Sequence, residues 1–299
     1  MSKIPENIIA KALETPNLSS AVVSAHQESL LESIKEASET GLIQPILIGD
    51  KEKIEKIAES INFKIKNLNI INKKSDVDCA IAACNLAKEN KIKIIIKGDL
   101  HTDVLMRLYL KKEFGLIEGR RLSHIWHMSG DNLKKSIFIT DGALNVNPRV
   151  DVKLQILKNA IEFANKTGLK KPKVAILSGT EDPIESMPSS IEAREVMKLA
   201  NKENLNAEVF GPLALDNAIS KYAAKIKKIQ NEVAGEADIL LVPNLETGNS
   251  LSKIMVYLMQ SCAAGIVVGG KVPVVVPSRA DNKISKLASI AAAIIASQD

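Results

Sequence analysis

The chain has 299 residues, of which 45% are apolar and 25% are charged, so it is long enough for one large domain or two medium ones. The formal net charge of +5 is small for this length and aromatic residues make up only 3%, which argues against nucleic acid as a partner. The N-terminal residues show no secretory signal, and no apolar run reaches the roughly 20 residues of a membrane span. We expect a cytoplasmic protein with no membrane partner.

Three cysteines, Cys79, Cys84 and Cys262, form no C-x-x-C pair, and their odd number argues against a disulfide framework. The sequence has no H-E-x-x-H motif and no cluster of residues with metal-ligand spacing. It also lacks a G-x-x-x-x-G-K-[ST] phosphate loop and a G-x-G-x-x-G fingerprint. We therefore expect a reducing compartment and no tightly held metal, and nucleotide hydrolysis and ordinary dinucleotide binding lose their usual support.

Short β-branched runs alternate with longer segments of helical period, which is typical of repeated βαβ units. One predicted helix, residues 29–40, stops at Gly41, a residue that tolerates the left-handed conformation of a helix C-terminus. The predicted strands are 45–49, 92–98, 123–128, 136–142, 173–179, 207–213, 237–243, 265–270 and 272–277. This pattern predicts an α/β fold with mostly parallel sheets.

Nine strands are many for one sheet, and the polar segment 129–135 is suited to a crossover between two lobes. If the last helix returns to the first lobe, the first domain is discontinuous. It then comprises residues 1–131 and 277–299, and the second domain comprises residues 132–276. In such an arrangement a cleft between the lobes is the expected active site.

Polar residues follow six of the predicted strands, in the segments 97–107, 140–149, 178–182, 210–218, 243–253 and 277–281. The carboxyl ends of parallel strands meet at one edge of a sheet, where ligands bind. Each segment alone is equally an ordinary turn with helix-capping residues. Six together favour a binding site at this edge.

The segment 243–253 reads PNLETGNSLSK and places Thr247, Gly248, Asn249 and Ser250 directly before a predicted amphipathic helix. A helix N-terminus offers free amides and a partial positive charge, so it can bind an anion. A plain helix cap at Asn249 or Ser250 is the alternative. That alternative leaves unexplained the glycine, which would let the backbone approach a ligand.

The segment PSRAD, residues 277–281, puts Ser278 and Arg279 where the last predicted strand ends. The planar guanidinium group of Arg279 suits phosphate or carboxylate, and the Ser278 hydroxyl can donate and accept beside it. The alternative is an arginine that only faces solvent. We expect this corner to bind an anion.

Four segments resemble, in order and spacing, the phosphate acetyltransferase and phosphate butyryltransferase family: KGDLHTDVLMR, FGPLALDNAISKYAA, VAGEADILLVPNLETGNSLSKIM and VPVVVPSRAD. The likeness covers nearly the whole chain, and SRAD looks closer to the butyryltransferase branch than the SRG of many acetyltransferases. The resemblance implies two α/β lobes like those of isocitrate and isopropylmalate dehydrogenases, with the active site between them. It also implies reversible transfer of an acetyl or butyryl group from acyl-CoA to inorganic phosphate, giving acyl phosphate and CoA. Such proteins are homodimers or larger homo-oligomers and use no redox cofactor.

In this reaction phosphate attacks the thioester carbonyl. Arg279 would stabilise the phosphate or the developing charge, and Ser278 would donate to the carbonyl oxygen or the leaving sulfur. Amides at Thr247, Gly248 and Asn249 would orient phosphate.

Three arginines are candidates for binding the phosphates of CoA: Arg107 first, then Arg120 or Arg121. Each is equally well explained as an exposed basic residue.

One position departs from the acetyltransferase pattern, in which an aspartate seven residues beyond the motif serine is proposed to deprotonate the thiol. Here Ser285 stands there, and a hydroxyl cannot act as a base at neutral pH. Asp281 is the nearest carboxylate, and it either replaces that base or caps the final helix. A thiolate held by Arg279 would need no dedicated base.

Several alternatives stay open. Two share the fold: a metal-dependent hydroxyacid dehydrogenase, for which we find no aspartate cluster, and a long-chain acyl carrier protein:phosphate acyltransferase, which needs a deep apolar channel. A catalytically silent sensor of CoA or acyl phosphate is the alternative from another class, and Ser285 keeps it open. The transferred acyl group, acetyl or butyryl, also stays open. One or two side chains of the pocket decide between the two groups, and their difference in binding free energy is about 1–3 kcal/mol.

Overall fold

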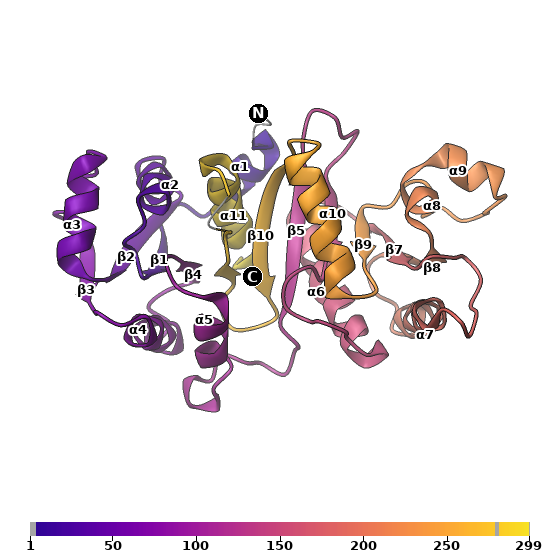
Figure 1. The fold of residues 1–299 in the computed structure, drawn as a ribbon, viewed down its shortest axis with the longest axis horizontal. Coiled ribbons are helices and arrows are strands. Elements are labelled where there is room, and N and C mark those ends of the chain that lie inside the picture. The colour runs from indigo at the N-terminus through magenta and orange to yellow at the C-terminus, as the bar shows by residue number, and fades with distance from the viewer. Residues whose placement is uncertain (1–3, 279–280, 299) are drawn as a thin grey trace. The chain divides into compact units, whose positions relative to one another are not determined.

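The computed structural model describes residues 4–278 and 281–298, and Figure 1 shows its fold. The chain forms two compact units, each described by itself. We call residues 4–120 and 264–298 the terminal unit and residues 121–263 the central unit. The boundaries between the two units fall at 120/121 and 263/264. The domain boundaries expected from the sequence fall at 131/132 and 276/277, and that domain division stays a prediction.

The terminal unit is an α/β structure built from the two ends of the chain. Its strands lie in the order β3-β2-β1-β4-β11-β10, and every neighbouring pair is parallel except β10 with β11. The elements are α1 (Glu6–Ala12), β1 (Leu18–Val23), α2 (Glu28–Glu39), β2 (Ile43–Gly49), α3 (Lys51–Ser60), β3 (Asn69–Asn72), α4 (Asp76–Lys88), β4 (Ile94–Lys97), α5 (Thr102–Tyr109), η1 (Lys112–Phe114), β10 (Cys262–Val268), which begins at the end of the central unit, β11 (Val274–Val275) and α11 (Lys283–Ala296).

Helices cover both faces of this sheet. α11 packs against α1 and α2, while α4 packs against α5. In Figure 1, α2 lies on one face of β1 and β2 and α4 lies on the other. Strand β4 is consequently buried at all four of its residues, as expected for a parallel strand between two helical layers.

The central unit has the same architecture. Its strands lie in the order β5-β6-β9-β7-β8, and only the β5–β6 pair is antiparallel. Helices α6 and α7 pack together on one face, and α8, α9 and α10 lie on the other (Figure 1). The elements are β5 (Ser123–Ser129), β6 (Ile137–Thr140), α6 (Val150–Lys166), β7 (Lys173–Leu177), α7 (Pro188–Lys202), β8 (Glu208–Leu213), α8 (Leu215–Ile219), α9 (Lys221–Ile226), β9 (Ile239–Leu241) and α10 (Leu245–Tyr257).

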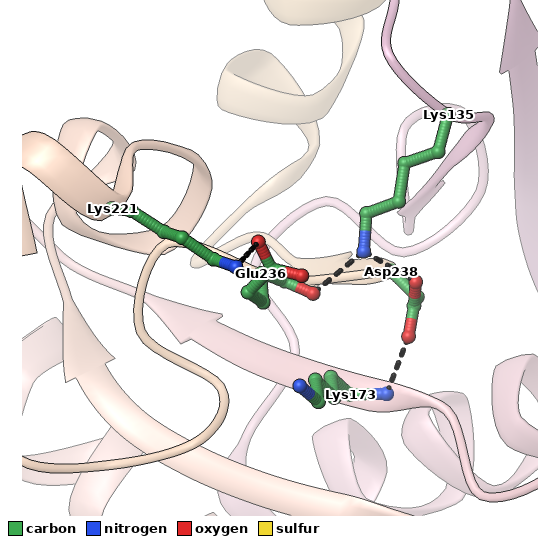
Figure 2. A network of polar contacts seen from close by, with 5 residues as sticks. All are labelled: Lys135, Lys173, Lys221, Glu236 and Asp238. Carbon is green, nitrogen blue, oxygen red and sulfur yellow. Dashed lines mark hydrogen bonds and ion pairs between the residues drawn. The ribbon is translucent and has the colours of Figure 1, made fainter.

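A polar network ties together the amino ends of the central strands (Figure 2). Lys135 Nζ, just before β6, donates to Asp238 Oδ1 and to the carbonyl of Glu236, both at 2.6 Å. The amide of Lys173, the first residue of β7, donates to Asp238 Oδ2 at 2.8 Å, and Lys221 pairs with Glu236 at 2.7 Å. These contacts fix the starts of β6, β7 and β9, so the opposite, carboxyl edge is the one available for a site.

The predicted α/β fold with mostly parallel sheets is confirmed. The predicted helix stop is also confirmed, because α2 ends at Glu39 and Gly41 has a φ of 76°. Strands β1 and β3 were not predicted. Within the described part of the chain, the three cysteines are buried and form no disulfide. No helix of that part is long and apolar enough to cross a bilayer.

Candidate functional site

The predicted site residues are divided between the two units, and Arg279 lies outside the residues that the structure describes. The terminal unit holds Arg107, Arg120, Ser278 and Asp281. The central unit holds Arg121, Thr247, Gly248, Asn249 and Ser250.

Ser278 and Asp281 form a closed turn after β11 in the terminal unit. The Ser278 amide donates to Asp281 Oδ2 at 2.8 Å, and the Asp281 amide donates back to the Ser278 carbonyl at 3.1 Å. An aspartate that bonds to nearby backbone in this way fixes a turn. The carboxylate of Asp281 therefore determines the backbone conformation at Ser278.

Asn282, and not Asp281, caps helix α11. Its side-chain oxygen accepts a hydrogen bond from the Ser285 amide at 2.8 Å, so the alternative that Asp281 caps this helix is wrong. Ser285, at the position of the expected acid, is 3% exposed, and its carbonyl accepts from Ser289 Oγ at 2.8 Å. A carboxylate at Ser285 would have to be buried in the first turns of the helix.

A buried lysine lies close to the same turn and was not singled out in the sequence. Lys286 is 2% exposed, and its Nζ donates to Ser29 Oγ at 2.8 Å. Burial lowers the pKa of Lys286, while the negative charges of Asp281 and Glu32 oppose that shift. The sequence signal was a lysine at the start of the largely apolar segment 287–296, and such a residue is usually interpreted as a side chain that reaches toward solvent.

In the central unit, α10 begins earlier than expected. Asn244 is its cap, and Asn244 Oδ1 accepts from the amide of Thr247 at 3.0 Å and from Thr247 Oγ1 at 2.7 Å. The Gly248 amide donates to the Asn244 carbonyl at 3.3 Å. The predicted helix start after Ser250 is therefore wrong, because the Asn244 side chain caps the helix several residues earlier. The amides of Thr247 and Gly248 are consumed inside the helix, which leaves side chains as the means of contacting phosphate.

Gly248 is explained by packing within the unit. A Cβ at this position would lie 2.9 Å from both the Asp141 carbonyl oxygen and the Gly142 Cα. Asn249 is half-buried next to it, with Nδ2 3.4 Å from the Gly142 carbonyl oxygen, and Ser250 is exposed. Helix α10 thus lies directly against the loop that follows β6.

The three candidate arginines differ in how they are held. Arg107 on α5 pairs with Asp103 at 3.0 Å, with both side chains 71% exposed, which is an ordinary surface ion pair. Arg120 is exposed. Arg121 is exposed as well, but its Nε donates to the buried Asn145 Oδ1 at 2.9 Å.

Among the described residues, no group of histidine, cysteine, aspartate and glutamate side chains is arranged to hold a metal ion. A sequence model of the family described as "Phosphate acetyl/butaryl transferase" matches residues 76–294. The chain belongs to this family. Its similarity to individual phosphate acetyl- and butyryltransferases extends over nearly the full length of the chain.

The phosphate acetyltransferase of Rickettsia prowazekii (strain Madrid E) is 40% identical over 278 residues, which are 92% of this chain and 79% of that protein. The phosphate butyryltransferase of Clostridium beijerinckii is 36% identical over 301 residues and is matched across 100% of both chains.

Among solved structures, the branched-chain phosphotransacylase from Enterococcus faecalis V583 matches with a TM-score of 0.81 and 31% identity, over 94% of this chain and 99% of that one. A 4-hydroxythreonine-4-phosphate dehydrogenase from Burkholderia phymatum shares the fold alone, with a TM-score of 0.60 and 12% identity, over 94% of this chain and 98% of that one. The expected family, the fold and the assignment as a phosphate acyltransferase are confirmed at the level of the family.

Proposed function

We propose that this acetyl/butyryltransferase family member transfers a short acyl group between CoA and inorganic phosphate. One observation carries the proposal: the chain belongs to the family along most of its length, and relatives named phosphate acetyltransferase and phosphate butyryltransferase match it at 36–40% identity. Because relatives of both names match, acetyl and butyryl are both proposed as the transferred group.

In the proposed reaction, a phosphate oxygen attacks the thioester carbonyl carbon and forms a C–O bond. The resulting oxyanion collapses and the C–S bond breaks, so acyl phosphate and the CoA thiolate leave. Arg279 supplies a positive charge for the phosphate or the oxyanion, and Ser278 donates a hydrogen bond to the carbonyl oxygen or the sulfur. Asp281 holds Ser278 in place through the turn after β11, an arrangement supported by the two hydrogen bonds between them.

The central unit contributes side chains in this proposal. Thr247, Asn249 and Ser250 lie in the first two turns of α10, and their hydroxyl and amide groups would orient phosphate. Gly248 has a packing role instead. Arg107, Arg120 and Arg121 are the proposed contacts for the phosphate groups of CoA.

No dedicated base is required for the thiol in this proposal. Ser285 stands where an acid was expected. The positive charge of Arg279, and that of Lys286 close to Asp281, would favour a thiolate. Asp281 is the carboxylate that would otherwise act as the base. We further propose that the protein works in the cytoplasm as a homodimer or larger homo-oligomer, without a cofactor, a nucleic acid or a membrane.

Thiol release from acetyl-CoA and butyryl-CoA, with phosphate added or omitted, tests the proposal. We expect release only with phosphate, a large loss in Arg279→Ala, and full activity in the matched control Arg194→Ala, at an exposed arginine of α7. Full activity in Arg279→Ala would refute the site assignment. Binding of CoA without any turnover would instead favour the silent sensor that Ser285 keeps open.

A further inference from the structure

Asp141 organises the loop that follows β6 in the central unit. It is 2% exposed, and its two carboxylate oxygens accept four hydrogen bonds. Oδ1 accepts from the amides of Ala143 and Leu144, both at 2.9 Å. Oδ2 accepts from the His124 amide at 3.1 Å and from Asn145 Nδ2 at 2.6 Å. A carboxylate has only acceptors, so four N–H donors match it and fix both the loop and the start of β5.

The Asn145 side chain has one possible orientation in this arrangement. It is 5% exposed, and its Nδ2 group donates to Asp141 Oδ2 at 2.6 Å and to the Leu122 carbonyl at 2.9 Å. Both amide hydrogens are therefore used, and Oδ1 must face the opposite way, toward a donor. That donor is Arg121 Nε, at 2.9 Å.

Arg121 is held at its backbone as well as at Nε. Its amide donates to Gln155 Oε1 at 2.8 Å, and its carbonyl accepts from Asn159 Nδ2 at 2.9 Å, so two residues of α6 fix its position. Its two terminal guanidinium nitrogens make no hydrogen bond or ion pair with any residue that the structure describes. Arg121 therefore presents a fixed, unused pair of donors at the carboxyl edge of the central sheet.

We propose that Asn145 is a positioning residue: anchored by Asp141, it orients Arg121 so that the terminal guanidinium nitrogens bind a phosphate group of a substrate. The inference rests on the proposed function, because that function supplies the two phosphate-bearing substrates, acyl-CoA and inorganic phosphate. A guanidinium group fixed at Nε loses less freedom when it binds phosphate than a free one does. Arg107, paired with a neighbouring exposed carboxylate, has no such preparation.

The test compares Asn145→Ala, Arg121→Ala and the double variant with the wild-type enzyme. Steady-state kinetics are measured with acyl-CoA varied, with the corresponding dephospho-CoA thioester varied, and with phosphate varied. We expect Asn145→Ala to raise one KM roughly tenfold, the loss typical of one hydrogen bond to a charged group, with kcat little changed. If the KM for acyl-CoA rises but the KM for the dephospho-CoA thioester does not, Arg121 binds the 3′-phosphate of CoA. If both of these KM values rise, Arg121 binds the diphosphate of CoA. If only the KM for inorganic phosphate rises, Arg121 binds the attacking phosphate.

The double variant separates positioning from general damage. If Asn145 acts through Arg121, the double variant has the same KM as Arg121→Ala alone, whereas independent effects multiply. Ser190→Ala, which truncates a fully buried hydroxyl elsewhere in the same unit, is the control and should leave each KM unchanged.

Two results would overturn the inference: unchanged KM values in Arg121→Ala, or a KM in the double variant that is the product of the two single effects. If wild-type enzyme shows no phosphate-dependent thiol release, the proposed function fails instead. In that case isothermal titration of CoA and of phosphate into the same variants still decides whether Asn145 orients Arg121 for phosphate.

Discussion

Ser278 and Asp281 are joined by two hydrogen bonds, one in each direction. We expect Asp281→Ala to lower kcat/KM at least tenfold, about the effect of losing one such hydrogen bond to a carboxylate. Asp281→Asn keeps an oxygen that accepts from the Ser278 amide, so it should retain most of the activity. Equal damage in both variants would show that the negative charge, acting as a base, is what matters.

Gly248 should not tolerate a side chain. In Gly248→Ala the new methyl group meets the Asp141 carbonyl oxygen and the Gly142 Cα, both backbone atoms, at 2.9 Å. We expect the free energy of unfolding in urea to fall by about 1–3 kcal/mol, as for other overpacked sites. Gly179→Ala is the control, since its methyl group would meet only the flexible end of Met187. Equal stability of the two variants would contradict the close packing of α10 on the β6 loop.

Tyr109 should stabilise the terminal unit through its hydroxyl group. That group donates to the Val272 carbonyl at 2.7 Å and accepts from the Val272 amide at 3.2 Å, and both interactions are buried. Tyr109→Phe leaves both backbone groups without a partner, so we expect a loss of about 1–3 kcal/mol in the free energy of unfolding. The matched control is Tyr222→Phe, at a tyrosine that is 76% exposed, and it should be neutral. Calorimetry that found the two variants equally stable would refute this role.

Two buried histidines on β5 should make stability depend on pH. Burial lowers the pKa of His127 to about 4, and it lowers that of His124 despite the opposing charge of Asp141. The pKa of histidine in an unfolded chain is about 6.5, so between about pH 6.5 and 4 the unfolded state binds protons that the native state does not. The free energy of unfolding therefore falls as the pH falls through this window, by up to about 1.4 kcal/mol per pH unit for each histidine.

His127→Leu tests this directly, because it removes one proton from the difference between the two states. The slope of the free energy of unfolding against pH should decrease by the amount that one histidine contributes to it. Phe163→Leu is the control, since Phe163 packs on Phe138, the same ring that His127 contacts, without titrating. Phe163→Leu should lower the free energy of unfolding at every pH and leave its pH slope unchanged. A pH slope that His127→Leu does not change would contradict the claim that His127 is buried in its neutral form.

The sequence predicted the parallel strands well where they form apolar runs, because burial on both faces leaves a clear signal. It did not predict β1, whose LSSAVV contains two serines, or β3, which has only four residues, NIIN. The helix start at Leu245 was misplaced because glycine and serine at 248–250 resemble cap residues, whereas Asn244 holds the cap.

The candidate site was predicted only in part, for a physical reason. Ser278 and Asp281 are three residues apart and belong to one motif, so the contact between them is local. The link from Asp141 through Asn145 to Arg121 joins the loop after β6 to the segment that precedes β5. That link depends on the antiparallel register of β5 and β6, which spacing along the chain does not contain.

The most direct test of the central claim is the ratio of acyl phosphate formed to CoA thiol released by the purified wild-type enzyme. Acyl phosphate is trapped as its hydroxamate, and the thiol is titrated in the same sample. We predict equal amounts of both products with phosphate and neither without it. Thiol released with no acyl phosphate would identify a thioesterase and contradict the account.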